Sequence, residues 1–146
     1  MSQPPKVRFG ILCEDVRRED NGKLIFIGVY GSNVLVGGFP ATIVFANPVW
    51  FELKEPYEGV IWSQVLLDET KLTEAKGFAR IGVGNPVMSI QPIPLEVPRE
   101  GALSFQLKFS EDGDWQTAVT MPIKLNPSAS ASPPPASQSQ PASPAS

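Results

Sequence analysis

Apolar and polar residues alternate along much of this chain, which is the pattern of strands with one face in a core and one in water. The alternation is most regular near the C-terminus, in residues 103–109 and 119–125. Between these two segments lies Asp112-Gly113, and glycine tolerates the positive φ of a tight turn. We therefore predict that the two segments form an antiparallel hairpin with an Asp-Gly turn.

A second hairpin is predicted near the N-terminus. Residues 7–14 alternate, with Phe9, Ile11 and Cys13 on the face expected to point inward, and residues 24–30 form another β-rich run. The polar stretch between them contains Asn21-Gly22, the pair that best accommodates the positive φ values of a type I′ turn. We expect these two strands to pair antiparallel.

Further strands are expected over residues 33–36, 41–53, 60–67, 75–83 and 87–97. Proline removes a backbone donor, so the run 41–53 is expected to break at Asn47-Pro48. Residues 68–73 are interpreted as a polar connection with at most one helical turn. Pro92 and Pro94 remove donors from the same side of one strand, which predicts an edge strand that resists further pairing.

The fold class follows from the number and spacing of these segments. About seven to nine short strands with turn signals roughly every ten residues, and no stretch with helical periodicity, predict an all-β protein. We favour an antiparallel β-sandwich, Ig-like or jelly-roll-like, over a barrel. The domain is expected to span residues 7–125, after a flexible N-terminus of residues 1–6.

Residues 126–146 are expected to form a disordered tail. Positions 127–146 contain only Pro, Ala, Ser and Gln, so this segment has no apolar side chains large enough to form a core. One interpretation is a solubilising spacer. The other is a tether or a Pro-rich ligand centred on Pro133-Pro134-Pro135.

The amino-acid composition excludes several classes of function. There are 12 basic and 15 acidic residues, a net charge of −3, so no basic surplus is available for nucleic acid. The chain has no histidine and one cysteine, which excludes His-based zinc sites, Ser-His or Cys-His nucleophile pairs, and an internal disulfide. We expect no cofactor and no metal ion. Neither a signal peptide nor a membrane span is recognised, so a cytoplasmic location away from membranes is expected.

The candidate binding residues are charged and flank the first turn. Glu14, Asp15, Arg17 and Arg18 could form a charged recognition surface. The alternative is a solvated strand end, with an exposed ion pair worth less than about 1 kcal/mol. The sequence leaves both interpretations open.

Four other features each have a functional and a structural interpretation, and the structural one is preferred. Cys13 is expected to be buried, because an apolar setting raises the pKa of a thiol and makes it unreactive. The acidic residues Glu111, Asp112 and Asp114 are too few to bind Ca²⁺ and are interpreted as part of a turn. Glycines at 28–31 and 82–84 precede no helix that could hold a phosphate and are read as bulges or turns. Trp50, Trp62 and Trp115 are assigned to the core, although two of them exposed on one face would favour binding of carbohydrate or peptide.

The N-terminal motif resembles a known family. Residues 11–19 read Ile-Leu-Cys-Glu-Asp-Val-Arg-Arg-Glu, followed by Asn-Gly-Lys-Leu at 21–24 and Ile-Gly-Val-Tyr at 27–30. This is similar to an uncharacterised family of small bacterial β-sandwich proteins known only as a domain of unknown function. Phe39-Pro40 and the segment from Pro98 and Gly101 to Ile123 also fit. The resemblance implies a β-sandwich and no assigned activity.

The sequence thus favours a non-enzymatic β-sandwich binding module. Its expected partner is another protein, with a homodimer as one form of the interaction. One alternative is a structural component of a phage particle or a secretion assembly, with the tail as a spacer. Another is an enzyme that uses carboxylates alone, which would require two acids about 5–10 Å apart across a cleft.

Overall fold

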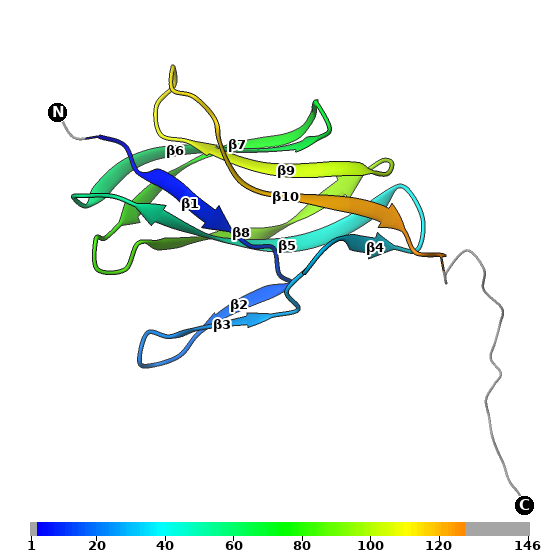
Figure 1. Cartoon of the computed structure of the whole chain (residues 1–146), viewed down its shortest axis with the longest axis horizontal. Helices are drawn as coiled ribbons and strands as arrows, with labels where there is room; N and C mark the ends of the chain where they lie inside the picture. The colour runs from blue at the N-terminus through cyan, green and yellow to red at the C-terminus, as the bar shows by residue number, and fades with distance from the viewer. Residues whose placement is uncertain (1–2, 128–146) are drawn as a thin grey trace, which may run out of the picture.

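The computed structural model describes residues 3–127, apart from the side chains of residues 91–93. Within this range the fold is all-β, as expected, but it has ten strands in place of seven to nine (Figure 1). The strands are β1 Lys6–Gly10, β2 Asp15–Arg18, β3 Leu24–Ile27, β4 Val34–Val36, β5 Ala41–Glu52, β6 Tyr57–Leu67, β7 Thr70–Ile81, β8 Val87–Val97, β9 Gly101–Lys108 and β10 Gln116–Leu125.

Two of the sheets form an open sandwich. One sheet has the strand order β1-β5-β8 and the other has the order β4-β10-β9-β6-β7. Neighbouring strands in both are antiparallel, except that β4 is parallel to β10. The strands β2 and β3 form a separate two-stranded sheet that lies outside the sandwich (Figure 1).

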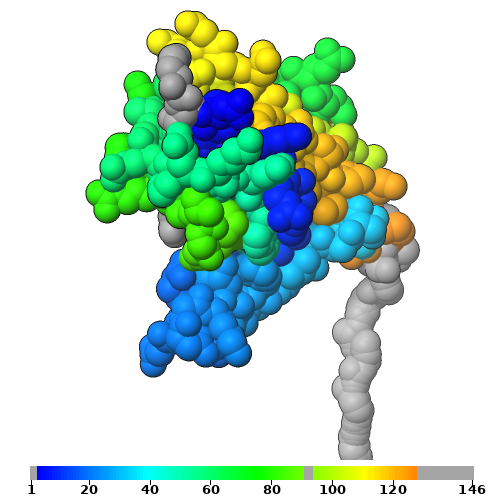
Figure 2. All heavy atoms as spheres, turned by 60° about the vertical axis from the view of Figure 1, so that its left-hand side comes forward, coloured from blue at the N-terminus to red at the C-terminus, as the bar shows by residue number. Residues whose placement is uncertain are grey.

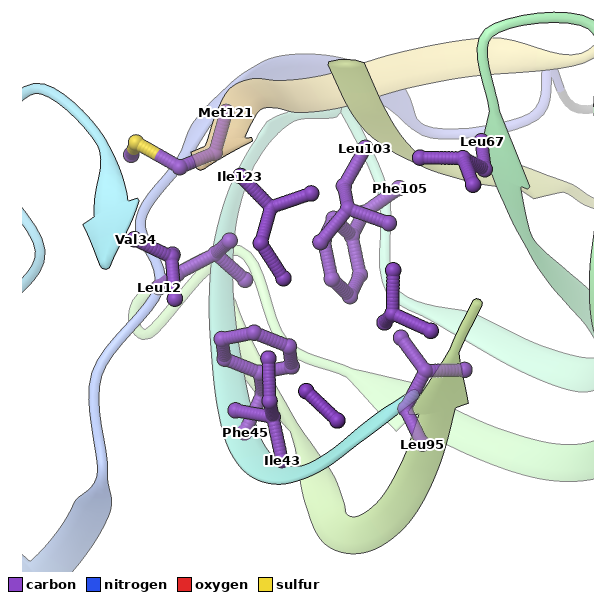
Figure 3. Close-up of a cluster of buried hydrophobic side chains, with 12 residues drawn as sticks. Leu12, Val34, Ile43, Phe45, Leu67, Leu95, Leu103, Phe105, Met121 and Ile123 are labelled. Atoms are coloured by element: carbon purple, nitrogen blue, oxygen red, sulfur yellow. The ribbon is translucent and has the colours of Figure 1, made fainter. Parts of the chain in front are cut away.

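The core lies between the two larger sheets and is built by the alternation seen in the sequence. Leu103, Phe105 and Leu107 of β9 point inward, as do Met121 and Ile123 of β10. Across the sandwich they meet side chains of β5 and β8, with the ring centroids of Phe45 and Phe105 5.5 Å apart (Figure 3). The larger cluster contains Leu12, Val34, Ala41, Ile43, Phe45, Leu67, Leu95, Val97, Leu103, Phe105, Met121 and Ile123.

The predicted C-terminal hairpin is confirmed, because β9 and β10 pair antiparallel. Its turn differs from the prediction, since Gly113 does not have a positive φ. The amide of Gly113 instead donates to the carbonyl of Ser110 over 3.1 Å, as in a tight four-residue turn. Glycine suits this position for a different reason: a Cβ here would lie 2.5 Å from Oγ of Ser110.

The predicted N-terminal hairpin is correct in the position of its turn and wrong in its turn type and its first strand. β1 pairs with β5, and Cys13 exchanges backbone hydrogen bonds with Ala46. The segment from β1 to Cys13 is therefore hydrogen-bonded to β5 and not to β3. The partner of β3 is therefore β2, which overlaps the polar stretch at Arg17 and Arg18. The turn has a positive φ at Gly22 alone, and its hydrogen bonds are those of a type I turn with a glycine bulge in place of type I′.

Two predictions for the middle of the chain are also wrong. β5 continues without a break through Asn47-Pro48. A register shift against β8 between Phe45 and Asn47 lets the strand accommodate the proline. The polar connection expected at 68–73 is a two-residue turn, in which Asp68 has a φ of 54°, so residues 70–73 belong to β7. The edge strand marked by Pro92 and Pro94 is confirmed, since β8 lies at the end of its sheet.

The ends of the domain are tied to the sandwich within the described residues. Pro5 is buried and its carbonyl accepts a hydrogen bond from Nε2 of Gln116, so the chain is fixed from Pro5, before the boundary expected at Val7. Strand β10 ends at Leu125, and the amide of Asn126 donates to the carbonyl of Val36 over 2.7 Å. The predicted tail lies, from residue 128 onward, outside the described residues.

Candidate functional site

The most distinctive surface feature is a projecting β-ribbon. We call residues 14–28, which contain β2, β3 and their turn, the arm (Figures 1 and 2). Its base is anchored in the core: Leu12 and Cys13, which precede it, are fully buried. After the arm, the amide of Tyr30 donates to the carbonyl of Leu12 over 2.9 Å. Both ends of the arm are thus fixed at one point of the sandwich.

One face of the arm contacts the sandwich through aromatic rings. Because side chains alternate along a strand, Leu24 and Phe26 point to the same side, and both are half-buried. The ring of Phe26 meets the ring of Trp50 edge-on, with centroids 5.6 Å apart. Trp50 in turn stacks on Phe9, with centroids 4.8 Å apart. Each such pair contributes about 0.5–1.5 kcal/mol beyond burial, so these rings hold the arm in place.

The opposite face of the arm is apolar and exposed. Ile25 is 42% exposed and Ile27 is 38% exposed. On the neighbouring strand, Arg17 lies opposite Ile25 and Asp15 lies opposite Ile27. This face therefore has two aliphatic side chains bordered by one basic and one acidic residue.

The structure places the predicted binding residues on this arm and separates them into three positions. Asp15 and Arg17 share the exposed face, with 3.3 Å between Oδ2 of Asp15 and Nε of Arg17. Arg18 lies opposite Leu24, on the other face. The ion pair anticipated from the sequence exists, and because both partners are exposed it is worth less than about 1 kcal/mol.

Glu14 occupies the base of the arm, over Gly28. The φ of Gly28 is 68°, and a Cβ added there would lie 2.2 Å from Oε1 of Glu14. The pKa of the Tyr30 hydroxyl is raised, mainly by burial and secondly by the negative charge of Glu14. Gly28 is thus required both for the left-handed backbone and for the space that Glu14 occupies.

The isoleucines of the exposed face were not recognised from the sequence. Residues 24–27 read Leu-Ile-Phe-Ile, an apolar run without alternation, which is as compatible with a strand buried on both faces. Only the location of this run, on a ribbon with one face against the sandwich, exposes Ile25 and Ile27. A sequence signal was available in the polar turn before the run and in Gly28 after it, which together limit the length of the strand.

Cys13 is buried, as expected, and burial raises the pKa of its thiol. Its predicted neighbours on the inward face are partly wrong. Phe9 is 47% exposed, and Leu12 points into the core instead. A register shift lies between Val7 and Phe9, and simple alternation does not continue after it, because the adjacent residues Leu12 and Cys13 are both fully buried.

The tryptophans are half-buried and lie on outer faces of the sandwich, so their assignment to the core is wrong. Trp50 lies beneath the arm, as described above. Trp62 and Trp115 lie under Lys108, whose Nζ is 5.9 Å and 4.7 Å from their ring centroids. The ammonium group of one lysine thus lies over both rings, in the geometry of a cation–π interaction.

Other candidate chemistry is limited in the described part of the chain. No group of three or more His, Cys, Asp and Glu residues is placed to hold a metal ion among the described residues. A cavity of about 50 Å³ lies between the sheets, lined in part by Phe45, Asn47 and Thr73. This volume has room for a few water molecules at most. A wider hollow of about 540 Å³ is lined in part by Lys6, Glu52 and Lys54. The arm projects from the sandwich and has an exposed apolar face, and we take it as the candidate site.

Comparison of the chain with protein-family models and with curated proteins gave no match. The resemblance described from the sequence therefore stays a prediction. Among the described residues there is also no helix that is long and apolar enough to cross a membrane.

Proposed function

We propose that this chain is a non-enzymatic β-sandwich domain that binds a protein partner through the arm. The observation that carries this proposal is the exposed face of the arm, where Ile25 and Ile27 project away from the sandwich. Folding of the domain does not require large aliphatic side chains there, because the arm is held by its other face. A surface of this composition is typical of protein recognition.

The composition of the exposed face fits a small interface. Protein interfaces commonly have an apolar centre and a polar rim, and here Ile25 and Ile27 would form the centre while Asp15 and Arg17 form the rim. A ribbon also offers backbone donors and acceptors at its edges, to which a partner can add a strand. Fixing both ends of the arm reduces the entropy lost on binding.

We also propose a cytoplasmic location. The chain contains a single cysteine, and Cys13 is buried and free, so the domain depends on no internal disulfide. Such a domain suits a reducing compartment.

Site-specific photocrosslinking in the cell that makes the protein would test the proposed function. A photoreactive phenylalanine analogue is placed at Ile27 on the arm or, as a control, at Phe78, which is 66% exposed on β7. We expect a covalent adduct with a protein from position 27 and none from position 78. We further expect Ile25→Ser to reduce the adduct from position 27. Equal adducts from both positions, or none from position 27, would refute the role of the arm.

A further inference from the structure

The outer edge of β3 has an unpaired set of backbone groups. The amide of Glu19 donates to the carbonyl of Lys23 over 2.8 Å, which fixes the alternation of hydrogen bonds along the arm. From this alternation, the backbone groups of Ile25 point toward β2, and those of Leu24 and Phe26 point away from it. In the described part of the chain, β2 is the only strand that pairs with β3. Figure 1 shows β3 on the side of β2 that faces away from the sandwich.

This edge lacks the protection that the edge strands β7 and β8 have. The edge strand β8 contains Pro92 and Pro94, which cannot donate to a further strand. The edge strand β7 carries charged side chains, and two of its ion pairs are Lys71 with Glu74 and Arg80 with Glu58 of β6. β3, in contrast, reads Leu-Ile-Phe-Ile, without a proline or a charge. An apolar edge of this kind favours pairing with another strand.

An antiparallel second copy of β3 fits this edge in one register. When Leu24 lies opposite Phe26 of the second copy, the amide and carbonyl of both residues are satisfied in both copies. Ile25 then faces Ile25 of the second copy across the two-fold axis, in a pair whose Cα atoms are about 4.5 Å apart. A register centred on Phe26 would instead require Gly28, whose carbonyl already accepts a hydrogen bond from Glu14. A register centred on Leu24 would require Gly22, whose amide already donates to the carbonyl of Glu19.

The charges near the arm favour the same antiparallel arrangement. Lys23 precedes β3, and Asp15 lies beside Ile27 at its other end. In the register described above, Ile27 lies opposite Lys23 of the second copy. Lys23 of one copy and Asp15 of the other then approach each other across Ile27. A parallel copy would place like charges together, which is unfavourable.

We infer that two copies of this chain pair through the outer edges of β3, forming a continuous sheet in the order β2-β3-β3-β2. This inference rests on the proposed function, and it names a second copy as the partner. The pairing covers Ile25 in both copies and satisfies the exposed backbone groups of Leu24 and Phe26. Isologous contacts of this kind close after two subunits, so the assembly stops at a dimer.

Charge substitution at Ile25 tests this pairing, with sedimentation equilibrium of the full-length chain as the readout. The wild-type chain is expected to dimerise as its concentration rises to about 100 µM. Ile25→Lys and Ile25→Glu each place like charges across the two-fold axis, and each is expected to raise the dimer dissociation constant at least about tenfold. An equimolar mixture of the two variants is expected to form a heterodimer. The control Phe78→Lys should dimerise like the wild type.

Three results would overturn the inference: a wild-type chain that is monomeric throughout, variants that dimerise normally, or a mixture that stays monomeric. Heterodimer formation by the mixture also shows that both variants are folded. The crosslinking experiment separates this inference from the proposed function. A monomeric chain whose position 27 crosslinks to a different protein would refute self-pairing and support the role of the arm. A monomeric chain that gives no adduct would refute both.

Discussion

Substitution of Phe26 by alanine should loosen the arm by an amount that can be derived from its contacts. Phe26 is half-buried, and complete burial of a phenylalanine is worth about 1.5–3 kcal/mol, so the lost burial costs about 1 kcal/mol. The edge-on contact with Trp50, at 5.6 Å between centroids, contributes about another 1 kcal/mol. We therefore expect Phe26→Ala to reduce the free energy of opening of the arm by about 2 kcal/mol.

Amide hydrogen exchange followed by NMR measures this change. The amide of Ile25 points toward β2 and reports opening of the arm, and a loss of about 2 kcal/mol should accelerate its exchange roughly 30-fold. The control is Ile27→Thr on the exposed face, which keeps a β-branched side chain and should accelerate exchange by less than about threefold. Similar acceleration in both variants would show that the ring contact with Trp50 does not hold the arm.

Three further predictions concern the arm, the core and the pH dependence of stability. Gly28→Ala should destabilise the protein by at least about 1–2 kcal/mol, because φ is positive at this position and a Cβ would overlap the side chain of Glu14; an unchanged midpoint of thermal unfolding would refute this. Ile123→Ala should cost about 2–5 kcal/mol in a urea titration, because Ile123 is fully buried in the larger cluster; a loss under about 1 kcal/mol would contradict the packing described. Burial raises the pKa of Cys13 above its ordinary 9.0 and the pKa values of Tyr30 and Tyr57 above 10.0. The unfolded chain therefore loses these protons first, and the free energy of unfolding should fall as the pH rises above about 9; an unchanged urea midpoint at pH 8 and pH 10.5 would contradict this.

The parts of the fold that could be predicted from the sequence depend on local signals. The alternation in residues 103–109 and 119–125 places alternate side chains in the core, whatever their partner strands are. Pro92 and Pro94 mark an edge because each removes a donor, which is a property of the residues themselves. Such features need no knowledge of contacts distant in sequence.

Strand partners depended on long-range contacts and were harder to predict. Asn21-Gly22 identified a turn, but a turn does not determine how far pairing extends from it. The bonds between Cys13 and Ala46 hold the preceding strand on β5, and no local pattern reports a pairing of residues so distant in sequence. The arm is short for this reason.

Only the charged residues of the candidate site were predicted from the sequence. Asp15 and Arg17 were recognised because charges that flank a turn are conspicuous in a sequence. Ile25 and Ile27 were missed because an apolar residue in a strand is normally buried. Their exposure follows from the projection of the arm, which is a property of the whole fold.

The central claim is that the arm is the binding element of this domain, and hydrogen exchange at Leu24 and Phe26 tests it most directly. Their amides point away from β2 and should exchange rapidly in dilute protein. When the binding partner is present, or at a concentration where the chain dimerises, these amides should become protected while the amides near Phe78 do not change. Continued rapid exchange at Leu24 and Phe26 in the bound state, or protection confined to the β7 face, would contradict the account.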